Sequence, residues 1–208
     1  MVRPKSPSRR VNRRKHIVQA AERVLLKEGL SGVTTRQISR EAGCSEGALY
    51  VHFRGRLELL LAVLEESLAE MLGPLQALHD RVGRGSPHSN LRVALAGIFR
   101  FHQRAMPFSA GLFAEPVLHA AYRQSLARQG KGPHLSIKAL ELYISAEQRI
   151  GRVDPEVNPG TAAYLLMSSA FFRAFSEQFF GRSMRPSWNT FARRLLVAVV
   201  PLTKHVRS

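Results

Sequence analysis

The chain has 208 residues, 45% of them hydrophobic, which is ordinary for a globular protein and enough for one sizeable core or two small ones. Its formal net charge of +16 and its pI near 11.3 indicate an anionic partner. The single cysteine, Cys44, excludes an intramolecular disulfide, and no apolar run is long enough for a secretory signal or a membrane span, so we expect a cytoplasmic protein with no membrane partner.

The chain begins with a basic segment. Residues 1–12 are rich in arginine, serine and proline, a composition that predicts a disordered tail. A run of like charges is usually a solvated segment. Beside a base-reading motif it would instead follow a nucleic-acid backbone, with Arg14 and Lys15 as expected contacts. Seven basic residues precede the first acidic one: Arg3, Lys5, Arg9, Arg10, Arg13, Arg14 and Lys15.

A first helix is predicted over residues 13–28. Gly29 follows where its apolar stripe ends, as expected at a helix C-terminus. The stripe has helical spacing and consists of Ile17, Ala20, Ala21, Val24 and Leu25.

Residues 35–54, TRQISREAGCSEGALYVHFR, have the pattern of a helix-turn-helix. Thr34 is placed to cap the first short helix, and Gln37 would complete a capping box. Gly43 falls where the chain must turn sharply, because glycine tolerates the left-handed backbone. Ser45 is placed to cap the second helix. The face turned to the core is then predicted to hold Ile38, Ala42, Leu49 and Phe53.

The opposite face of the second helix is the expected base reader. Side chains at the start of such a helix reach base edges in the major groove, which assigns this role to Ser45, Glu46, Gly47 and Ala48. Glu46 would accept from a cytosine amino group, or would be a solvated carboxylate favoured by the helix dipole. Gly47 and Ala48 would contact thymine methyl groups or allow close backbone approach.

The run TTRQISREAGCSEGALYVHFRGRLELL resembles the DNA-binding domain of the TetR family of bacterial transcriptional regulators, over about a quarter of the chain. Ser39, Cys44, Arg56 and Leu57 depart from the family pattern, which has alanine, valine, lysine and an acidic residue there. The matching positions are Thr35, Ile38, Ala42, Gly43, Ser45, Gly47, Leu49, Tyr50, His52, Phe53 and Leu59.

The resemblance implies that double-stranded DNA is the partner. It also implies phosphate contacts from Thr35, Arg36, Tyr50, His52 and Arg56. Arg56 is expected to begin the next helix, where backbone N–H groups also favour an anion. For Tyr50 the alternative is a ring that packs and a hydroxyl that contacts only water.

The rest of the sequence predicts helices only, so the expected fold class is all-α, with about nine helices. The fourth helix should begin near Arg56 and be kinked or ended by Gly73 and Pro74. Further helices are expected at residues 91–106 (interrupted by Pro107), 112–129, 135–150, 158–180 and 187–206. We expect a basic disordered tail at 1–12, a helix-turn-helix DNA-binding domain at 13–58, and an effector-binding and dimerisation domain at 59–208.

The last two predicted helices are the expected dimer surface. Their small and apolar residues permit close helix approach, and two half-sites are usually needed for tight specific binding. The alternative is that these faces build only the core of one subunit. The candidate interface residues are Ala163, Ala170, Trp188, Phe191, Leu195 and Val199.

Aromatic residues gather in the C-terminal part, where TetR relatives typically bind a small effector. Aromatic side chains at helical spacing more often form a core than a binding site. Arg173 would pair with Glu177 four residues on, or would bind an anionic ligand. The candidate ligand-binding residues are Phe99, His102, Phe113, Tyr143, Met167, Phe171 and Arg173.

Signatures of an enzyme are missing from the sequence. Glu115 and His119 have the spacing of metal ligands on a helix, but no third ligand is apparent. No glycine-rich phosphate loop or nucleophile elbow is present. We therefore expect no enzymatic activity, no metal and no cofactor. Cys44 is expected to pack in place of valine, with redox sensing as the alternative.

Together these patterns predict a homodimeric repressor that a small hydrophobic effector releases from a palindromic operator. It would be bacterial and cytoplasmic, and nucleoid-associated when bound to its operator. The alternative is an effector-independent architectural or nucleoid-type DNA-binding protein.

Overall fold

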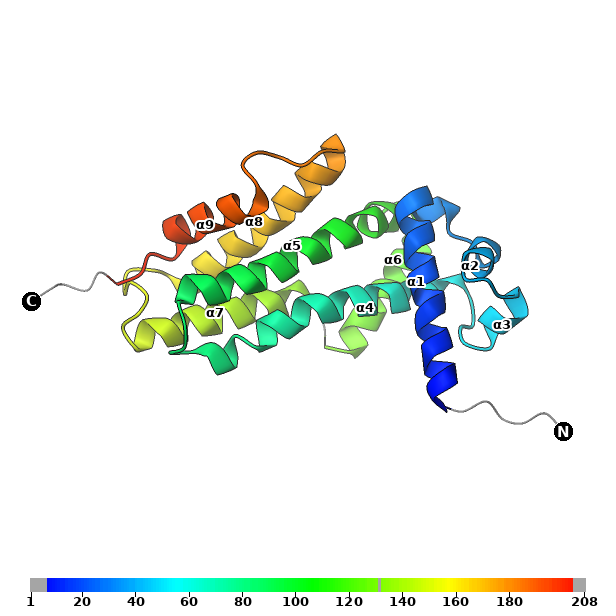
Figure 1. The fold of residues 1–208 in the computed structure, drawn as a ribbon, viewed down its shortest axis with the longest axis horizontal. Helices are drawn as coiled ribbons and strands as arrows, with labels where there is room; N and C mark the ends of the chain where they lie inside the picture. Colours follow the sequence, from blue (N-terminus) through cyan, green and yellow to red (C-terminus); the bar gives the residue numbers. More distant parts are fainter. Residues whose placement is uncertain (1–6, 131, 204–208) are drawn as a thin grey trace, which may run out of the picture. The chain divides into compact units, whose positions relative to one another are not determined.

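The protein is all-α, as predicted (Figure 1). A computed structural model describes residues 7–130 and 132–203, and this part contains nine α-helices and one short 3-10 helix. The helices are α1 (Pro7–Gly32), α2 (Thr35–Glu41), α3 (Glu46–Tyr50), α4 (Arg56–Gln76), η1 (His79–Arg81), α5 (Pro87–Leu112), α6 (Pro116–Arg128), α7 (Pro133–Arg149), α8 (Pro159–Phe180) and α9 (Trp188–Val199).

Two compact units make up the described chain. The first contains the residues up to Ser67 together with Pro107–Ser125, and the second contains Leu68–Met106 together with the residues from Leu126 onward. The boundary expected at residue 58 falls inside α4, and the first unit also takes in the end of α5 and most of α6.

The core of the first unit joins the helix-turn-helix to the corner between α5 and α6. Phe108, Leu112 and Leu118 are buried in the same cluster as Leu49 and Phe53. Gly111 allows the approach, because a Cβ added there would lie 2.4 Å from the Cβ of Leu30. The predicted stripe of α1 and the predicted inward face of the helix-turn-helix are both buried in this cluster: Ile17, Ala20, Ala21, Val24, Leu25, Ile38, Ala42, Leu49 and Phe53.

The second unit has its own core, formed mainly by α5, α7 and α8. Helices α7 and α8 pack against each other, and α9 packs on α8. Phe99 of α5 stacks on Trp188 of α9, with ring centroids 4.0 Å apart. The largest buried side chains of this core include Leu78, Leu91, Leu95, Ile98, Leu140, Ile144 and Leu166.

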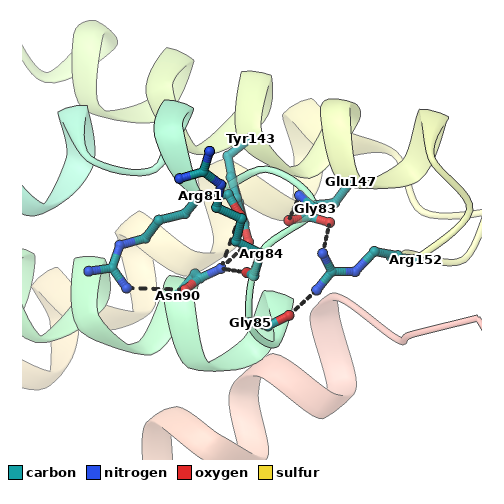
Figure 2. A network of polar contacts seen from close by, with 8 residues as sticks. All are labelled: Arg81, Gly83, Arg84, Gly85, Asn90, Tyr143, Glu147 and Arg152. Carbon is teal, nitrogen blue, oxygen red and sulfur yellow. Dashed lines mark hydrogen bonds and ion pairs between the residues drawn. The ribbon is translucent and has the colours of Figure 1, made fainter.

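A polar network fixes the loop between η1 and α5 (Figure 2). The buried Glu147 accepts from the backbone N–H of Gly83 at 3.2 Å and lies 3.3 Å from a guanidinium nitrogen of Arg152. Asn90 donates to the Tyr143 hydroxyl at 2.9 Å and to the Arg84 carbonyl at 2.8 Å. Burial, the larger cause, and the nearby Glu147 together raise the pKa of Tyr143, so its hydroxyl stays protonated.

Several predicted helix limits need correction. Helix α1 begins at Pro7, so residues 7–12 are helical where a disordered tail was predicted; residues 1–6 lie outside the described part. Proline is well tolerated in the first turn of a helix, as at Pro7 and again at Pro116 in α6. Residues 7–12 of the predicted tail therefore belong to the first helix.

The prolines at two other positions do not end their helices. Pro74 lies inside α4 and Pro107 inside α5, although each proline removes one backbone hydrogen bond. Phe108 and Leu112, which follow Pro107, are buried in the core of the first unit. Helix α9 ends at Val199, earlier than residue 206, because Pro201 disfavours helical backbone at Val200.

Within residues 7–130 and 132–203, no helix is both long and apolar enough to cross a membrane.

Candidate nucleic-acid interface

Two capped short helices build the candidate interface. Thr34 has extended backbone, and its hydroxyl oxygen accepts from the Gln37 N–H at 3.1 Å, which starts α2 as predicted. The Gln37 side chain accepts from the Thr34 hydroxyl at 3.0 Å. Ser45 starts α3 in the same way by accepting from the Ala48 N–H at 3.2 Å. These caps satisfy N–H groups that the first turn leaves without helical partners.

The turn between the helices depends on Gly43. Its φ of 59° lies in the left-handed region, where a side chain would strain the backbone. The N–H of Cys44 then donates to the Ser39 carbonyl at 2.9 Å. Leu49 and Phe53 are buried, so the opposite side of α3 is left at the surface.

The predicted DNA contacts lie on the surface of the first unit. The Arg14 guanidinium lies over the Phe53 ring, 4.9 Å from its centroid, which places this cation of α1 beside the end of the helix-turn-helix. Arg14, Lys15, Arg36, Ser45, Gly47 and Tyr50 are exposed, and Thr35, Glu46, Ala48, His52 and Arg56 are half-buried.

Thr35 and Glu46 connect the starts of the two helices. The Thr35 hydroxyl donates to Oε2 of Glu46 at 3.0 Å. No local sequence pattern indicates this bond, because eleven positions separate the partners and each residue type also suits a contact to DNA.

Arg56 has protein partners for most of its donors. Its guanidinium donates to the carbonyls of Leu30 at 2.6 Å and Val33 at 2.8 Å. Two further bonds reach the carboxylate of Glu115, at 2.8 and 2.9 Å. Such a bidentate pair has little left to offer a phosphate. The phosphate contact that the resemblance implies for Arg56 stays a prediction, and its observed role is to tie α4 to the turn before α2.

Glu115 is thus engaged by an arginine. The hydrogen bonds from Arg56 are the largest cause that lowers the pKa of the Glu115 carboxyl, and they raise that of the guanidinium. Across the described chain, no three histidine, cysteine, aspartate or glutamate side chains are grouped as metal ligands. No sequence signal pairs Arg56 with Glu115, because 59 positions separate them.

A second ion pair braces α1 against α2. The Arg23 side chain donates to Glu41 at 2.6 Å, and this bond is the largest cause that lowers the pKa of Glu41. The Gln37 amide donates to Glu28 at 2.5 Å. Both pairs are exposed, so they orient the helices more than they stabilise them.

The candidate ligand-binding residues are not gathered in one place. Phe113 is 75% exposed and belongs to the first unit, whereas the other candidates belong to the second. Tyr143 is held in the Asn90 network and Phe99 in its stack on Trp188. Met167 is buried in the core.

His102 and Phe171 do lie together. Their rings meet edge to face with centroids 5.2 Å apart, and Phe101 lies 5.1 Å from the same imidazole. Burial lowers the pKa of His102 to about 4, so its ring is neutral near pH 7. Its Nε2 is buried without a hydrogen-bond partner.

Arg173 makes the pair with Glu177 that the sequence predicted. Its Nε donates to Glu177 at 2.6 Å, and its Nη2 donates to the carbonyls of both Met184 and Pro186. Gln103 donates to the second oxygen of Glu177 at 3.1 Å. The guanidinium is buried, and Glu177 balances its charge. Its bonds to the two carbonyls attach the loop after α8 to that helix.

The candidate dimer residues divide into two groups. Ala163 and Ala170 are fully buried in the core of the second unit, because the small face of α8 packs inward. These two residues therefore cannot form the dimer contact that was predicted for them. Trp188, Phe191, Leu195 and Val199 of α9 are half-buried. The exposed apolar residues of α8 and α9 are Tyr164, Leu165, Phe171, Phe172, Phe175, Phe179, Phe180 and Val197.

An apolar hollow of about 530 Å³ lies in the second unit. Leu75 and Gln76 of α4, His79 and Val82 line one wall, and α7 forms the other. Of the predicted ligand residues, Tyr143 alone lines it.

A helix-turn-helix with an exposed second helix defines a class of DNA-binding proteins. Residues 17–63 match the family described as "Bacterial regulatory proteins, tetR family". Residues 17–63 therefore match the DNA-binding domain of the TetR family of bacterial regulatory proteins, as the resemblance predicted.

Individual proteins share this domain. The HTH-type transcriptional regulator SrpR of Pseudomonas putida is 49% identical over 51 residues, which cover 24% of each chain. The nucleoid occlusion factor SlmA of Vibrio cholerae is 40% identical over 65 residues, covering 29% of this chain and 33% of that protein. The chain thus matches only about a quarter to a third of the length of these relatives.

The fold is similar over nearly the whole chain. The structure of SmeT, the repressor of the Stenotrophomonas maltophilia multidrug efflux pump SmeDEF, has a TM-score of 0.63 and 21% identity, and the match covers 90% of both chains. At this identity the likeness establishes the fold alone.

Proposed function

We propose that the protein is a sequence-specific DNA-binding transcriptional regulator that acts as a homodimeric repressor on a palindromic operator. The observation that carries the proposal is the exposed face of α3, which Ser45 caps and which Leu49 and Phe53 anchor from below. A helix presented in this way fits the major groove of DNA. Arg14 and Arg36 are exposed in the same unit and supply positive charge for the phosphates.

The exposed aromatic residues of α8 support a dimer. Phe172, Phe175 and Phe179 follow one another along the helix, with successive ring centroids 6.4 and 5.6 Å apart. Large apolar patches on a surface usually mark an interface. We therefore move the proposed interface from Ala163 and Ala170 to this face, together with the half-buried residues of α9.

A small effector is proposed to bind beside His102. The neutral imidazole has an unsatisfied Nε2 and aromatic neighbours on α5 and α8, which favours an aromatic, uncharged molecule with a polar group that can form one hydrogen bond to Nε2. Arg173 supports an anionic effector poorly, because Glu177 already balances its charge. Binding would release DNA by selecting a conformation that fits the operator less well.

Selection of genomic fragments by the purified protein at physiological salt tests this function. The proposal expects enrichment of a palindromic motif with half-sites about one helical turn apart, and sedimentation of the free protein as a dimer. Retention of unrelated fragments without a motif would contradict it.

An architectural, nucleoid-type DNA-binding role is the second candidate. The net charge of +16 and the similarity to SlmA, a nucleoid occlusion factor, favour it. In that case deletion of residues 1–12 should abolish most of the binding. For the regulator, the same deletion should lower affinity and flatten its salt dependence while leaving the selected motif unchanged.

A further inference from the structure

We infer that Glu46 selects cytosine in the bound DNA, and that Thr35 is a positioning residue that holds its carboxylate. This inference rests on the proposed function and assigns a base preference within it. It also gives Thr35 a role different from the phosphate contact that the family resemblance implies.

The geometry joins the first residues of both helices of the motif. Thr35 begins α2 and Glu46 begins α3, and the hydroxyl donates to Oε2 of the carboxylate at 3.0 Å. The caps at Thr34 and Ser45 fix where each helix begins. The carboxylate is therefore held at the end of α3 that would face the bases.

The hydroxyl of Thr35 has only one proton. A threonine hydroxyl is one donor with two acceptor lone pairs, and here the donor is used by Glu46. A phosphate oxygen only accepts hydrogen bonds. While the bond to Glu46 is intact, Thr35 thus has nothing to donate to the DNA backbone.

The carboxylate of Glu46 can accept a further hydrogen bond from a base. Its second oxygen, Oε1, keeps its acceptor capacity, and an ionised carboxylate cannot donate. Guanine presents only acceptors in the major groove, and adenine places its N7 acceptor beside its N6 amino group, where it repels a carboxylate; cytosine presents its N4 amino group, the usual partner of a glutamate. A held carboxylate therefore favours cytosine and rejects guanine at the base pair that it faces.

The surroundings allow an anion at this surface. Arg36, Arg40 and Glu46 line the same hollow of about 430 Å³, so the surface that carries the carboxylate also carries two guanidinium groups that can face DNA phosphates. Within the described part of the chain, no arginine or lysine forms an ion pair with Glu46. Its acceptor capacity is thus not taken up by a cation.

Selection from a random duplex library with the full-length protein tests the inference. The wild-type motif should contain an invariant cytosine in each half-site. Glu46→Gln should shift that position toward adenine, which pairs with an amide, and reduce the preference for cytosine about tenfold. Glu41→Gln is the matched control: it removes the same charge from the same unit, but Glu41 pairs with Arg23 on α1. It should leave the motif unchanged.

Thr35→Val separates positioning from phosphate contact. If Thr35 positions Glu46, the valine variant loses preference at the same base pair as Glu46→Gln, and Thr35→Ser restores it. A uniform loss of affinity across all sequences would show that Thr35 contacts a DNA phosphate, and would overturn its role as a positioning residue.

An unchanged motif for Glu46→Gln would overturn the assignment of Glu46 while leaving the proposed function standing. A wild-type protein that selects no motif would instead overturn the proposed function itself. Circular dichroism of each variant excludes misfolding as the cause.

Discussion

The helix-turn-helix motif of the first unit and the helical core of the second unit differ in how far apart in the sequence their hydrogen-bonded residues lie. In the helix-turn-helix of the first unit, the caps join residues three positions apart and the turn closes over a few residues. In the second unit, Gly83 contacts Glu147 and Gln103 contacts Glu177, pairs separated by 64 and 74 positions. The DNA reader is a local structure, and the candidate effector region is a tertiary one.

This difference explains why only one of the two sites has a sequence signature. Turn and cap chemistry leaves a pattern at fixed spacing. A binding region assembled from helices that are distant in the sequence contains apolar residues at helical spacing, and this pattern is the same as that of an ordinary core. Substitutions can test how far the helix-turn-helix depends on contacts within the motif.

The largest effect is expected from Phe53→Ala. This fully buried ring lies under α3, so its removal should destabilise the first unit by about 3–5 kcal/mol. Phe113→Ala is the control in the same unit: its ring is 75% exposed and should cost little. Urea unfolding measures both. Equal losses would show that the helix-turn-helix core does not depend on Phe53.

The same comparison shows what could be predicted from the sequence. Ile38, Leu49 and Phe53 were placed correctly on the inward face, because their helical spacing and the turn at Gly43 define that face without other information. Ala163 and Ala170 were misplaced, because small residues suit a close contact within one subunit as well as between two. Arg56 gained Glu115 as a partner through a tertiary contact that no local pattern indicates.

The next effect is a pH dependence in the second unit. The pKa of His102 is lowered by burial to about 4 in the folded state, below its ordinary value of 6.5. The unfolded chain therefore binds the proton more readily, and stability is lost as pH falls from about 6.5 toward 4. The loss is about 3 kcal/mol by proton linkage.

His102→Phe should remove most of that pH dependence, since phenylalanine does not titrate. Unfolding free energies at pH 7 and pH 4.5 compare the variant with wild type. His134→Phe serves as the control, because His134 is exposed. A variant as acid-sensitive as the wild type would show that His102 is accessible to protons in the folded state.

A smaller effect is expected from the cap of α3. Ser45→Ala removes the acceptor for the Ala48 N–H and should cost about 1 kcal/mol, whereas Ser45→Asp keeps an acceptor and should cost less. Because α3 has only one turn, DNA affinity should fall along with stability. A Ser45→Ala protein with the stability of Ser45→Asp would show that packing alone starts the helix.

The smallest effect concerns Arg56 and Glu115. Glu115→Gln leaves Arg56 without its counter-charge, and since both side chains are about one-third exposed the cost should be below about 1 kcal/mol. The lowered pKa of Glu115 means that its stabilisation is present above the unfolded pKa and lost as pH falls through the folded value. The variant should thus lose less stability than wild type below about pH 4. Glu141→Gln, from a surface pair with Lys138, is the control.

The most direct test of the central claim is a competition measurement of the ratio between two dissociation constants at physiological salt. One is for the best duplex selected by the full-length protein, and the other is for a scrambled duplex of the same composition. Sequence-specific reading by α3 should give a ratio of at least about a thousand, as for other specific DNA-binding proteins, and Phe53→Ala and Glu46→Gln should both reduce it. A ratio near one would contradict sequence-specific reading by α3 and would leave only the basic charge to account for binding.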